Sequence, residues 1–451
     1  MADESTSHDG QLQKSLGFWQ VMFYGMGSML GAGIYGLIGK AAGSLGNAVW
    51  LAFVVAMFAA MLTGLSYACV GSRFPRAGGA AYVTQQAFSR SWLSYVVGIA
   101  VMMSGLTSMA TGTQLIAASL IKAMHLPVNE KLLSIVLVMM VGLIIFRGIR
   151  ESMWANITCT VIEASGLIFI IAVGMRFWGS VDYLAVPPAA SAEGLWMVVL
   201  QGAVLTFYSF IGFEDLLNVS EEVKDAPRNL PRGLIAAMIG STCIYMMVAI
   251  TAVSVVPWGQ LAASNTPLMD VAHTAAPWFK GIDTVYVFIT IFSIGNTALL
   301  NYLMGSRLLY GMSSQGLMPP ILGKVHATRR TPHIAIMVLF VIVATLILSG
   351  GVKQLAEATV LLLLIVFITV NASLVRLKIT RPTERGQFEV PIFVPVIGGV
   401  VCAILVIARV SSAITSADPA GRTAPLIAGA IVLIALGLFK WLKPSKAVLE
   451  E

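Results

Sequence analysis

Residues 17–38 read GFWQVMFYGMGSMLGAGIYGLI, an apolar stretch in which Gly25, Gly27, Gly31 and Gly33 lie close together. About 20 apolar residues cross a bilayer as an α-helix, so the stretch predicts a membrane span. Each glycine in a helix interior costs about 1 kcal/mol relative to alanine, and backbone groups freed in a membrane must line a cavity or find partners. The stretch therefore predicts a broken helix whose bare amides bind a ligand carboxylate. Close helix packing through small residues is the alternative.

The rest of the chain repeats this apolar pattern. Of its 451 residues, 57% are hydrophobic and 11% are charged, whereas soluble domains carry about 25% charged residues. This composition excludes a soluble globular protein and predicts an all-α polytopic membrane protein with about twelve transmembrane helices. The predicted spans are residues 17–38, 46–70, 92–122, 131–147, 152–178, 194–219, 232–256, 281–312, 334–350, 355–377, 391–413 and 424–442.

The distribution of basic residues predicts the orientation. An even number of spans places both termini on one side of the membrane. With that side in the cytoplasm, most of the 28 Lys and Arg residues fall in cytoplasmic segments, where such residues concentrate. The same asymmetry accounts for the net charge of +7, and no nucleic-acid partner is predicted. We expect a multi-pass protein of the cell (inner) membrane, with a disordered cytoplasmic tail at residues 1–16 and another cytoplasmic tail at 443–451.

The sixth predicted span carries a second interruption. Residues 205–215 read LTFYSFIGFED, so Gly212, Glu214 and Asp215 break an apolar run. The first and sixth spans each open a block of five, and broken helices at corresponding positions of two inverted halves indicate a transporter binding site. Facing half-helices direct backbone amides at an anion and carbonyls at a cation. The two breaks therefore predict a secondary transporter with its site between them.

Several motifs, in order along the chain, resemble those of the amino acid–polyamine–organocation superfamily. They are GAGIY at 31–35, RFPRAGGAAY at 73–82, FYSFIGFE with EEVKDAPRNLP within 207–231, and SRLLYGM with GLMPP within 306–320. The resemblance implies a five-plus-five inverted-repeat transport core, residues 17–378, in which helices 1 and 6 are discontinuous. It also implies two additional transmembrane helices within residues 391–442. It implies a permease for amino acids that works by alternating access, either proton-coupled or as an exchanger. A polyamine or cationic amino acid antiporter is the alternative.

The resemblance also implies the residues of the site. The substrate carboxylate is expected on the amides near Ala32, Gly33 and Ile34, and the substrate amine on the carbonyls near Met29, Tyr208 and Ile211. Tyr208 falls where relatives carry an aromatic gate. Relatives often have a hydroxyl where this chain has Ala32, which leaves the amides alone for the carboxylate. The other implied substrate-binding residues are Gly31, Ser104, Gly105, Ser108, Phe207 and Asn301.

Two acids within the predicted spans are candidates for coupling. Glu163 lies in the middle of the fifth span, where an acid costs at least about 2.5 kcal/mol and is by default functional. It is interpreted as a proton-coupling residue or a counter-charge, with a structural buried acid as the alternative. Glu214 follows the second break, where the resemblance implies a sensor of protons or of the substrate amine, and capping of the half-helix is the alternative. Asp215 is interpreted as a cap or an interfacial residue, and the loop acids as solvated partners of nearby bases (Glu221, Glu222, Lys224 and Arg228).

Other classes of protein fit the sequence less well. The four cysteines stand singly in apolar runs, which supports neither a zinc site nor a disulfide framework. The five histidines fall in predicted loops or tails, so we expect no metal, no cofactor and no catalytic centre in the membrane. A channel needs pore-lining rings or filter loops, and paired helix breaks stand in their place. The expected partners are a small amino acid or amine, membrane lipid and protons.

Overall fold

The computed structural model describes residues 14–76, 78–124, 127–188, 199, 203, 206–264, 266–349, 352–415 and 419–442. Secondary structure within these residues consists of helices and contains no strand, so the predicted all-α fold is confirmed. Six described helical stretches are long and apolar enough to cross a membrane. Shorter apolar helices follow at His333–Leu348, Phe393–Ile407 and Ala428–Leu442. The protein is a polytopic helical membrane protein.

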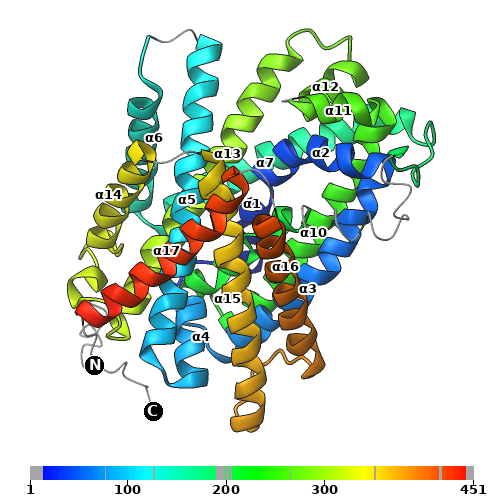
Figure 1. Ribbon diagram of the computed structural model, residues 1–451. Helices are drawn as coiled ribbons and strands as arrows, with labels where there is room; N and C mark the ends of the chain where they lie inside the picture. The colour runs from blue at the N-terminus through cyan, green and yellow to red at the C-terminus, as the bar shows by residue number, and fades with distance from the viewer. Residues whose placement is uncertain are drawn as a thin grey trace, which may run out of the picture.

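The helices follow the predicted spans closely (Figure 1). The first half contains α1 (Phe18–Met29), α2 (Ala32–Leu45), η1 (Gly46–Ala48), α3 (Val49–Arg73), α4 (Gly79–Phe88), α5 (Ser91–Met124), α6 (Glu130–Arg147), α7 (Ile149–Gly174) and η2 (Met175–Phe177). The second half contains η3 (Tyr208–Phe210), η4 (Phe213–Glu222), α10 (Ala226–Val255), α11 (Trp258–Ala263), α12 (Pro267–Ala275), α13 (Ile282–Ser314), η5 (Pro320–Gly323), α14 (His333–Ser349), α15 (Val352–Thr380), α16 (Phe393–Thr415) and α17 (Pro419–Leu442).

One predicted span is only partly described, and one prediction differs from the structure. The span 194–219, which was predicted to be broken, lies partly outside the described residues, and its described end forms the separate 3₁₀ helices η3 and η4. The short helices α4, α11 and α12 fall where the sequence predicted loops. They are too short to span a bilayer, and Figure 1 places α11 and α12 near α2, at the opposite end of the bundle from α4. As helices, these connecting segments pair their own backbone N–H and C=O groups, which need hydrogen-bond partners when they are buried.

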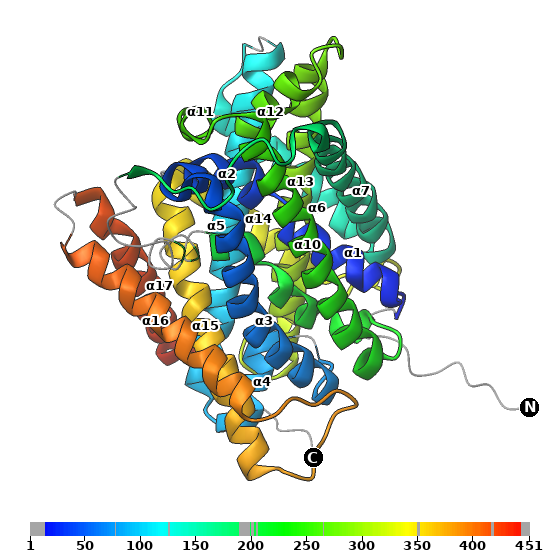
Figure 2. The ribbon, with the colours of Figure 1, turned by 90° about the vertical axis from the view of Figure 1, so that its right-hand side faces the viewer.

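The long helices pack into one bundle. The helix α10 packs along α3 and α1, α13 along α5 and α7, and α15 along α5 and α16. Figure 2 shows α16 and α17 along one outer edge. Large apolar side chains on these two helices are exposed: Ile404 is 58% exposed and Leu433 is 69% exposed. Such a surface is costly in water and suits contact with lipid tails.

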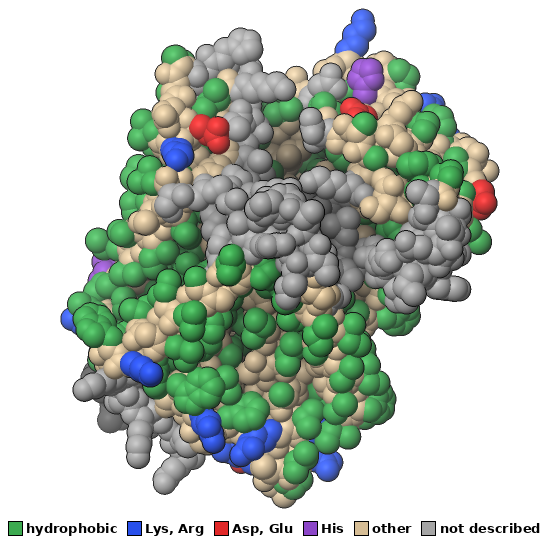
Figure 3. Space-filling view, viewed as in Figure 1, with side chains coloured by type: hydrophobic (Ala, Val, Ile, Leu, Met, Phe, Trp, Pro, Cys, Tyr) green, Lys and Arg blue, Asp and Glu red, His purple; other side chains and the backbone are tan. Residues whose placement is uncertain are grey.

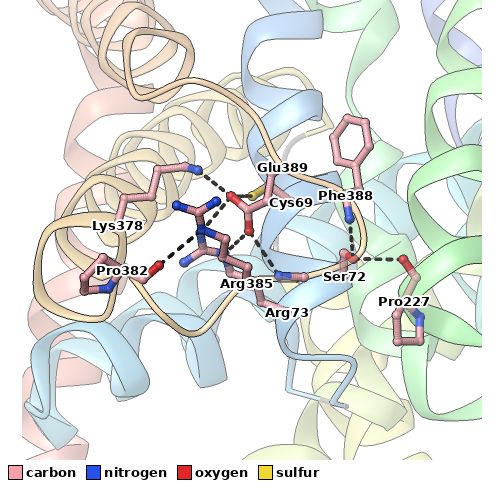
Figure 4. Close-up of polar contacts among 10 residues, drawn as sticks. Cys69, Ser72, Arg73, Pro227, Lys378, Pro382, Arg385, Phe388 and Glu389 are labelled. Carbon is pink, nitrogen blue, oxygen red and sulfur yellow. Dashed lines mark hydrogen bonds and ion pairs between the residues drawn. The ribbon is translucent and has the colours of Figure 1, made fainter.

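A polar cluster joins the segment before α16 to the core (Figure 4). Glu389 accepts hydrogen bonds from Arg73 at 2.7 Å and from Lys378 at 2.6 Å. Ser72 donates to the carbonyl of Pro227 at 2.8 Å and accepts the amide of Phe388 at 3.0 Å. Burial by itself would raise the pKa of Glu389, but the hydrogen bonds from Arg73 and Lys378 outweigh it and lower the pKa to about 2. The cluster therefore stays charged at neutral pH and holds α3, α10 and α15 to the segment that leads into α16.

Candidate substrate-binding site

The first break lies between α1 and α2. Leu30, which follows α1, is extended (φ −62°, ψ 127°), and α2 begins two residues later at Ala32. The first amides of a helix have no carbonyl within the helix to bond. Among the described residues no acceptor bonds the amides of Gly33 or Ile34. The positive end of α2 is thus directed at the break, an arrangement that favours an anion. That a substrate carboxylate binds here stays a prediction.

The second break lies between η3 and η4, at Ile211 and Gly212. Gly212 has φ +126°, a conformation that residues with a side chain rarely adopt. A Cβ at this position would stand 2.5 Å from the carbonyl oxygen of Ser28 in α1. The amide of Gly212 donates to the carboxylate of Glu214 at 2.8 Å. Glycine therefore allows the second break to lie directly against the first.

Tyr245 of α10 joins the two breaks. Its hydroxyl lies 2.6 Å from the carbonyl oxygen of Met29 and 3.0 Å from that of Ser209. These carbonyls end broken helical segments, where backbone acceptors lack partners within the helix. The ring is fully buried and packs against Phe53 and Phe210, with centroids 5.6 and 5.5 Å away. Tyr245 was not among the predicted site residues, because a tyrosine in an apolar span gives no indication of its hydrogen-bond partner.

A cavity of about 60 Å³ lies where the breaks meet. Because one water molecule needs about 10–15 Å³ of such space, the cavity holds a few waters, and an amino acid fits only if its walls move apart. The helices α5, α13 and α15 complete its walls. The lining residues are Ser28, Met29, Gly31, Gly33, Ser104, Gly105, Ser108, Ile211, Gly212, Glu214, Asp215, Thr297, Asn301, Met304, Thr359 and Leu363.

Many of the predicted site residues border this cavity. They are Met29, Gly31, Gly33, Ser104, Gly105, Ser108, Ile211, Asn301 and Glu214. Two others do not line it: Ile34 is fully buried, and Phe207 packs against Phe367 with ring centroids 6.5 Å apart. The side chains of Ala32 and Tyr208 lie outside the described part of the chain. Contact of each of these residues with a substrate stays a prediction.

The glycines of the first span are tightly packed as well. A Cβ on Gly27 would stand 2.2 Å from the hydroxyl of Thr160, and one on Gly31 would stand 2.7 Å from that of Thr297. A Cβ on Gly33 would meet the backbone of Ser209 at 2.8 Å. Helix packing, the alternative interpretation, therefore accounts for Gly33 as well as for its neighbours. Gly31 and Gly33 also line the cavity, so packing and an open amide surface occur at the same residues.

Two adjacent acids face the cavity from the start of η4. Glu214 and Asp215 are 4% and 3% exposed. Asp215 accepts a hydrogen bond from the hydroxyl of Ser28 at 2.9 Å, which joins η4 to α1. Acids are favoured in the first turn of a helix, where Asp215 lies. Capping alone does not describe this residue, however, because it also lines the cavity. The adjacency of two acids in an apolar run was the signal that could have identified it.

Glu163 lies apart from the cavity, between α7 and α13. It is fully buried, its Oε1 accepts a hydrogen bond from the hydroxyl of Ser293, and its Oε2 has no partner among the described residues. The hydroxyl of Tyr35 in α2 donates to its backbone carbonyl at 3.2 Å. In the next part of the same interface, Asn296 donates to Thr160 at 3.0 Å. A polar layer therefore connects α7 and α13 behind the first break.

Glu222 contradicts the sequence interpretation of the loop acids. Glu222 does not lie on a solvated face and does not pair with Lys224 or Arg228; it is fully buried and accepts a hydrogen bond from Arg307 of α13 at 3.0 Å. The backbone carbonyl of Glu222 also accepts the amides of Ser15 and Leu16, both at 2.9 Å. The interpretation was wrong because pairing across 85 residues of sequence outcompetes the neighbouring bases once the segment is buried.

Comparison with known proteins agrees with this architecture. The chain is 26% identical over 416 residues to the branched-chain amino acid permease BcaP of Bacillus subtilis, covering 88% of this chain and 87% of that protein. It is 26% identical to the methylthioribose transporter of the same organism, over 87% of each chain. It is 27% identical to the chloroplastic cationic amino acid transporter 9 of Arabidopsis thaliana, over 72% of this chain and 60% of that protein. Residues 16–436 match the amino acid permease family. The chain is therefore a member of the amino acid permease family and, as its motifs indicated, of the amino acid–polyamine–organocation superfamily.

Proposed function

We propose that the protein is a secondary active transporter of amino acids that works by alternating access around the cavity between the two breaks. One observation carries the proposal: the cavity is bordered by the amide end of α2 on one side and by Glu214 and Asp215 on another. A zwitterion carries a carboxylate and an amine, and helix-end amides and acids are the groups that stabilise them. Because the cavity is too small for an amino acid in this conformation, binding requires the movement that alternating access supplies.

The lining favours substrates with a positive charge near the acids. Among the described lining residues, two are acids and none is a base. The relatives named above transport, by their names, branched-chain amino acids, cationic amino acids and a thio-sugar, so their names leave the choice open. The α-amine supplies the required cation in every amino acid. A second cationic group would suit the second carboxylate, and cationic amino acids or amines are the alternative substrates.

Counterflow in liposomes tests the proposal. Purified protein is reconstituted in vesicles loaded with unlabelled leucine, lysine or putrescine, and uptake of the same labelled compound is followed. A carrier gives saturable uptake that is accelerated by the internal substrate. Uptake that does not saturate and is not accelerated indicates a channel, and conversion of the labelled compound indicates an enzyme. Either result would overturn the proposal.

The acids at η4 provide the first prediction. Asp215→Asn is expected to raise KM about tenfold with a smaller change in kcat, because a hydrogen bond to a charged group contributes about 1.5–3 kcal/mol. The matched control is Asp270→Asn in α12, where the acid bonds Ser264 and does not line the cavity. KM values from initial rates of uptake decide the question, and an unchanged KM in Asp215→Asn would remove the acid from the substrate site.

Tyr245 provides the second prediction. Tyr245→Phe is expected to lower the uptake rate about tenfold, because the loss of the hydroxyl leaves a buried carbonyl at the breaks without its donor, at a cost of about 1–3 kcal/mol. Tyr286→Phe is the control, since that hydroxyl also donates to a buried carbonyl, Gly166 at 2.6 Å, away from the breaks. Uptake rate and Tm are measured for both variants. Similar falls in uptake for the two would make Tyr245 an ordinary packing residue.

Glu163 supports the coupling part of the proposal. We propose that Glu163 takes up and releases the proton that drives accumulation. It is fully buried beside the polar layer of α7 and α13, and its Oε2 is left without a described partner. It lies outside the cavity, so it acts on the substrate through α2, to which the hydroxyl of Tyr35 connects it. Exchange without net proton movement is the alternative mode.

The orientation and the remaining regions follow from the same proposal. The end of the bundle that carries Arg73, Lys378 and Arg381 is the cytoplasmic end, because basic residues concentrate there. Both termini are then cytoplasmic and the membrane is the cell membrane. Residues 17–378 form the transport core and 391–442 the two outer helices. No catalytic role is assigned to the chain.

A further inference from the structure

A groove of about 580 Å³ runs between α15 and α16. It is separate from the substrate cavity, since no residue lines both. Apart from one arginine and one threonine its walls are apolar or glycine. Two of them, Ile379 and Val400, are 66% and 53% exposed on the outer face of the bundle. The lining residues are Phe88, Ile368, Ala372, Val375, Arg376, Ile379, Thr380, Pro395, Val396, Gly399, Val400 and Ala403.

Arg376 stands at the basic end of this groove. Its guanidinium lies over the ring of Phe88, 5.4 Å from the centroid, and its Nε donates to the carbonyl of Ala87 at 2.7 Å. These two contacts fix the plane of the guanidinium. Its Nη1 and Nη2 groups bond no described residue. The guanidinium of Arg376 is therefore held in place, with free N–H donors, next to the apolar groove.

The neighbouring cations differ in this respect. Lys378 is paired with Glu389 at 2.6 Å, and Arg381 lies 3.3 Å from Glu384. Figure 3 shows the hydrophobic face formed by α15, α16 and α17, with Lys and Arg side chains gathered along its lower edge. Anionic headgroups collect at such an edge, where each nearby base contributes to their attraction.

We propose that this groove binds an anionic phospholipid, with an acyl chain between α15 and α16 and the phosphate on the guanidinium of Arg376. The planar donors of arginine match phosphate oxygens in a bidentate arrangement. An acyl chain fills the apolar groove that the exposed residues Ile379 and Val400 leave open. The site joins α16 to α15 by a lipid, in addition to the cluster at Glu389.

A second copy of the chain suits the groove less well. In a two-fold interface the same patch contacts itself, so two Arg376 side chains and their basic neighbours would approach each other. The described acids near the patch, Glu384 and Glu389, are already paired. The lipid brings the missing negative charge and the apolar chain in one molecule.

Thermal stability of the purified protein in neutral detergent tests the site with three probes: dioleoylphosphatidylglycerol, dioleoylphosphatidylcholine and inorganic phosphate. We expect the phosphatidylglycerol to raise Tm, the phosphatidylcholine to raise it less, and phosphate alone to leave it unchanged. Arg376→Gln is expected to weaken the response to phosphatidylglycerol about tenfold in concentration, the loss of a charged hydrogen bond. Val400→Trp, which fills the groove, is expected to abolish it.

Two control variants leave the site intact. Arg381→Gln removes a base from the same edge, and Ile404→Trp adds the same bulk beyond the groove at a residue that is 58% exposed. Both are expected to change the response to phosphatidylglycerol far less than Arg376→Gln and Val400→Trp do. Equal stabilisation by the two lipids, or a full response to phosphate alone, would overturn the proposal. A change of oligomeric state in Val400→Trp, measured by light scattering, would assign the groove to a contact between copies.

Discussion

Replacing Glu163 with Gln is expected to preserve exchange of substrate and to abolish its accumulation against a gradient. The amide of Gln matches the protonated acid in shape and still accepts the hydrogen bond that Ser293 donates, but it cannot release a proton. A potential of 100 mV contributes about 2.3 kcal/mol per charge moved, which corresponds to an accumulation ratio of about fiftyfold for one coupled proton. We therefore expect this ratio to fall to about one in the variant, measured in vesicles with an imposed potential and pH gradient.

The same variant separates three roles of the acid. If Glu163 is only structural, Tm falls and accumulation per active molecule is retained. If it is a counter-charge, affinity for cationic substrates falls while that for neutral ones is unchanged. Glu130→Gln, at an exposed acid in the first turn of α6, is the matched control and is expected to accumulate substrate normally. Full accumulation by Glu163→Gln would end the coupling role and direct attention to Glu214.

Replacing Arg307 with Met is expected to cause the largest loss of stability. Arg307 and Glu222 are both fully buried and form an ion pair at 3.0 Å. Removing one partner leaves an uncompensated buried charge, which typically costs about 3–5 kcal/mol. The double variant Glu222→Gln with Arg307→Met is expected to recover most of this, since no unpaired charge remains. The free energy of unfolding in detergent micelles is the measurement.

The exposed pair Arg381–Glu384 supplies the control for Arg307. Its side chains are 34% and 52% exposed, and such surface pairs contribute about 1 kcal/mol or less. Arg381→Met is therefore expected to leave the unfolding free energy nearly unchanged. A loss of under 1 kcal/mol in Arg307→Met as well would mean that water reaches the pair and that its burial in this conformation does not persist.

The helices were the most predictable part of the structure. The predicted span 92–122 is α5 (Ser91–Met124), and 281–312 is α13 (Ile282–Ser314). A bilayer imposes a minimum length and a continuous apolar composition, so both ends of a span are marked in the sequence. Short helices such as α11 (Trp258–Ala263) carry no such mark. Their position depends on packing against α2, which sequence alone does not reveal.

The site was predictable where the backbone itself is unusual. Glycines and acids inside apolar runs marked both breaks, and the residues around Gly31 and Gly212 do meet at one cavity. The contacts between distant residues could not be predicted in the same way. Tyr245 is separated from Met29 by 216 residues and Arg307 from Glu222 by 85, and each side chain is of a type that occurs in many other surroundings. Substrate contact with any lining residue is still a prediction.

The chain before α1 is held by main-chain atoms: the amides of Ser15 and Leu16 bond the carbonyl of Glu222, and the amide of Lys224 bonds the carbonyl of Leu16 at 2.8 Å. Side-chain substitution does not alter such bonds, but deuterium labelling reports on them directly, because an amide exchanges only when its bond opens. If this end of the bundle separates during the transport cycle, these three amides should exchange faster when substrate is cycling than when it is absent. They are thus a built-in isotopic reporter of opening that requires no probe to be attached to the protein.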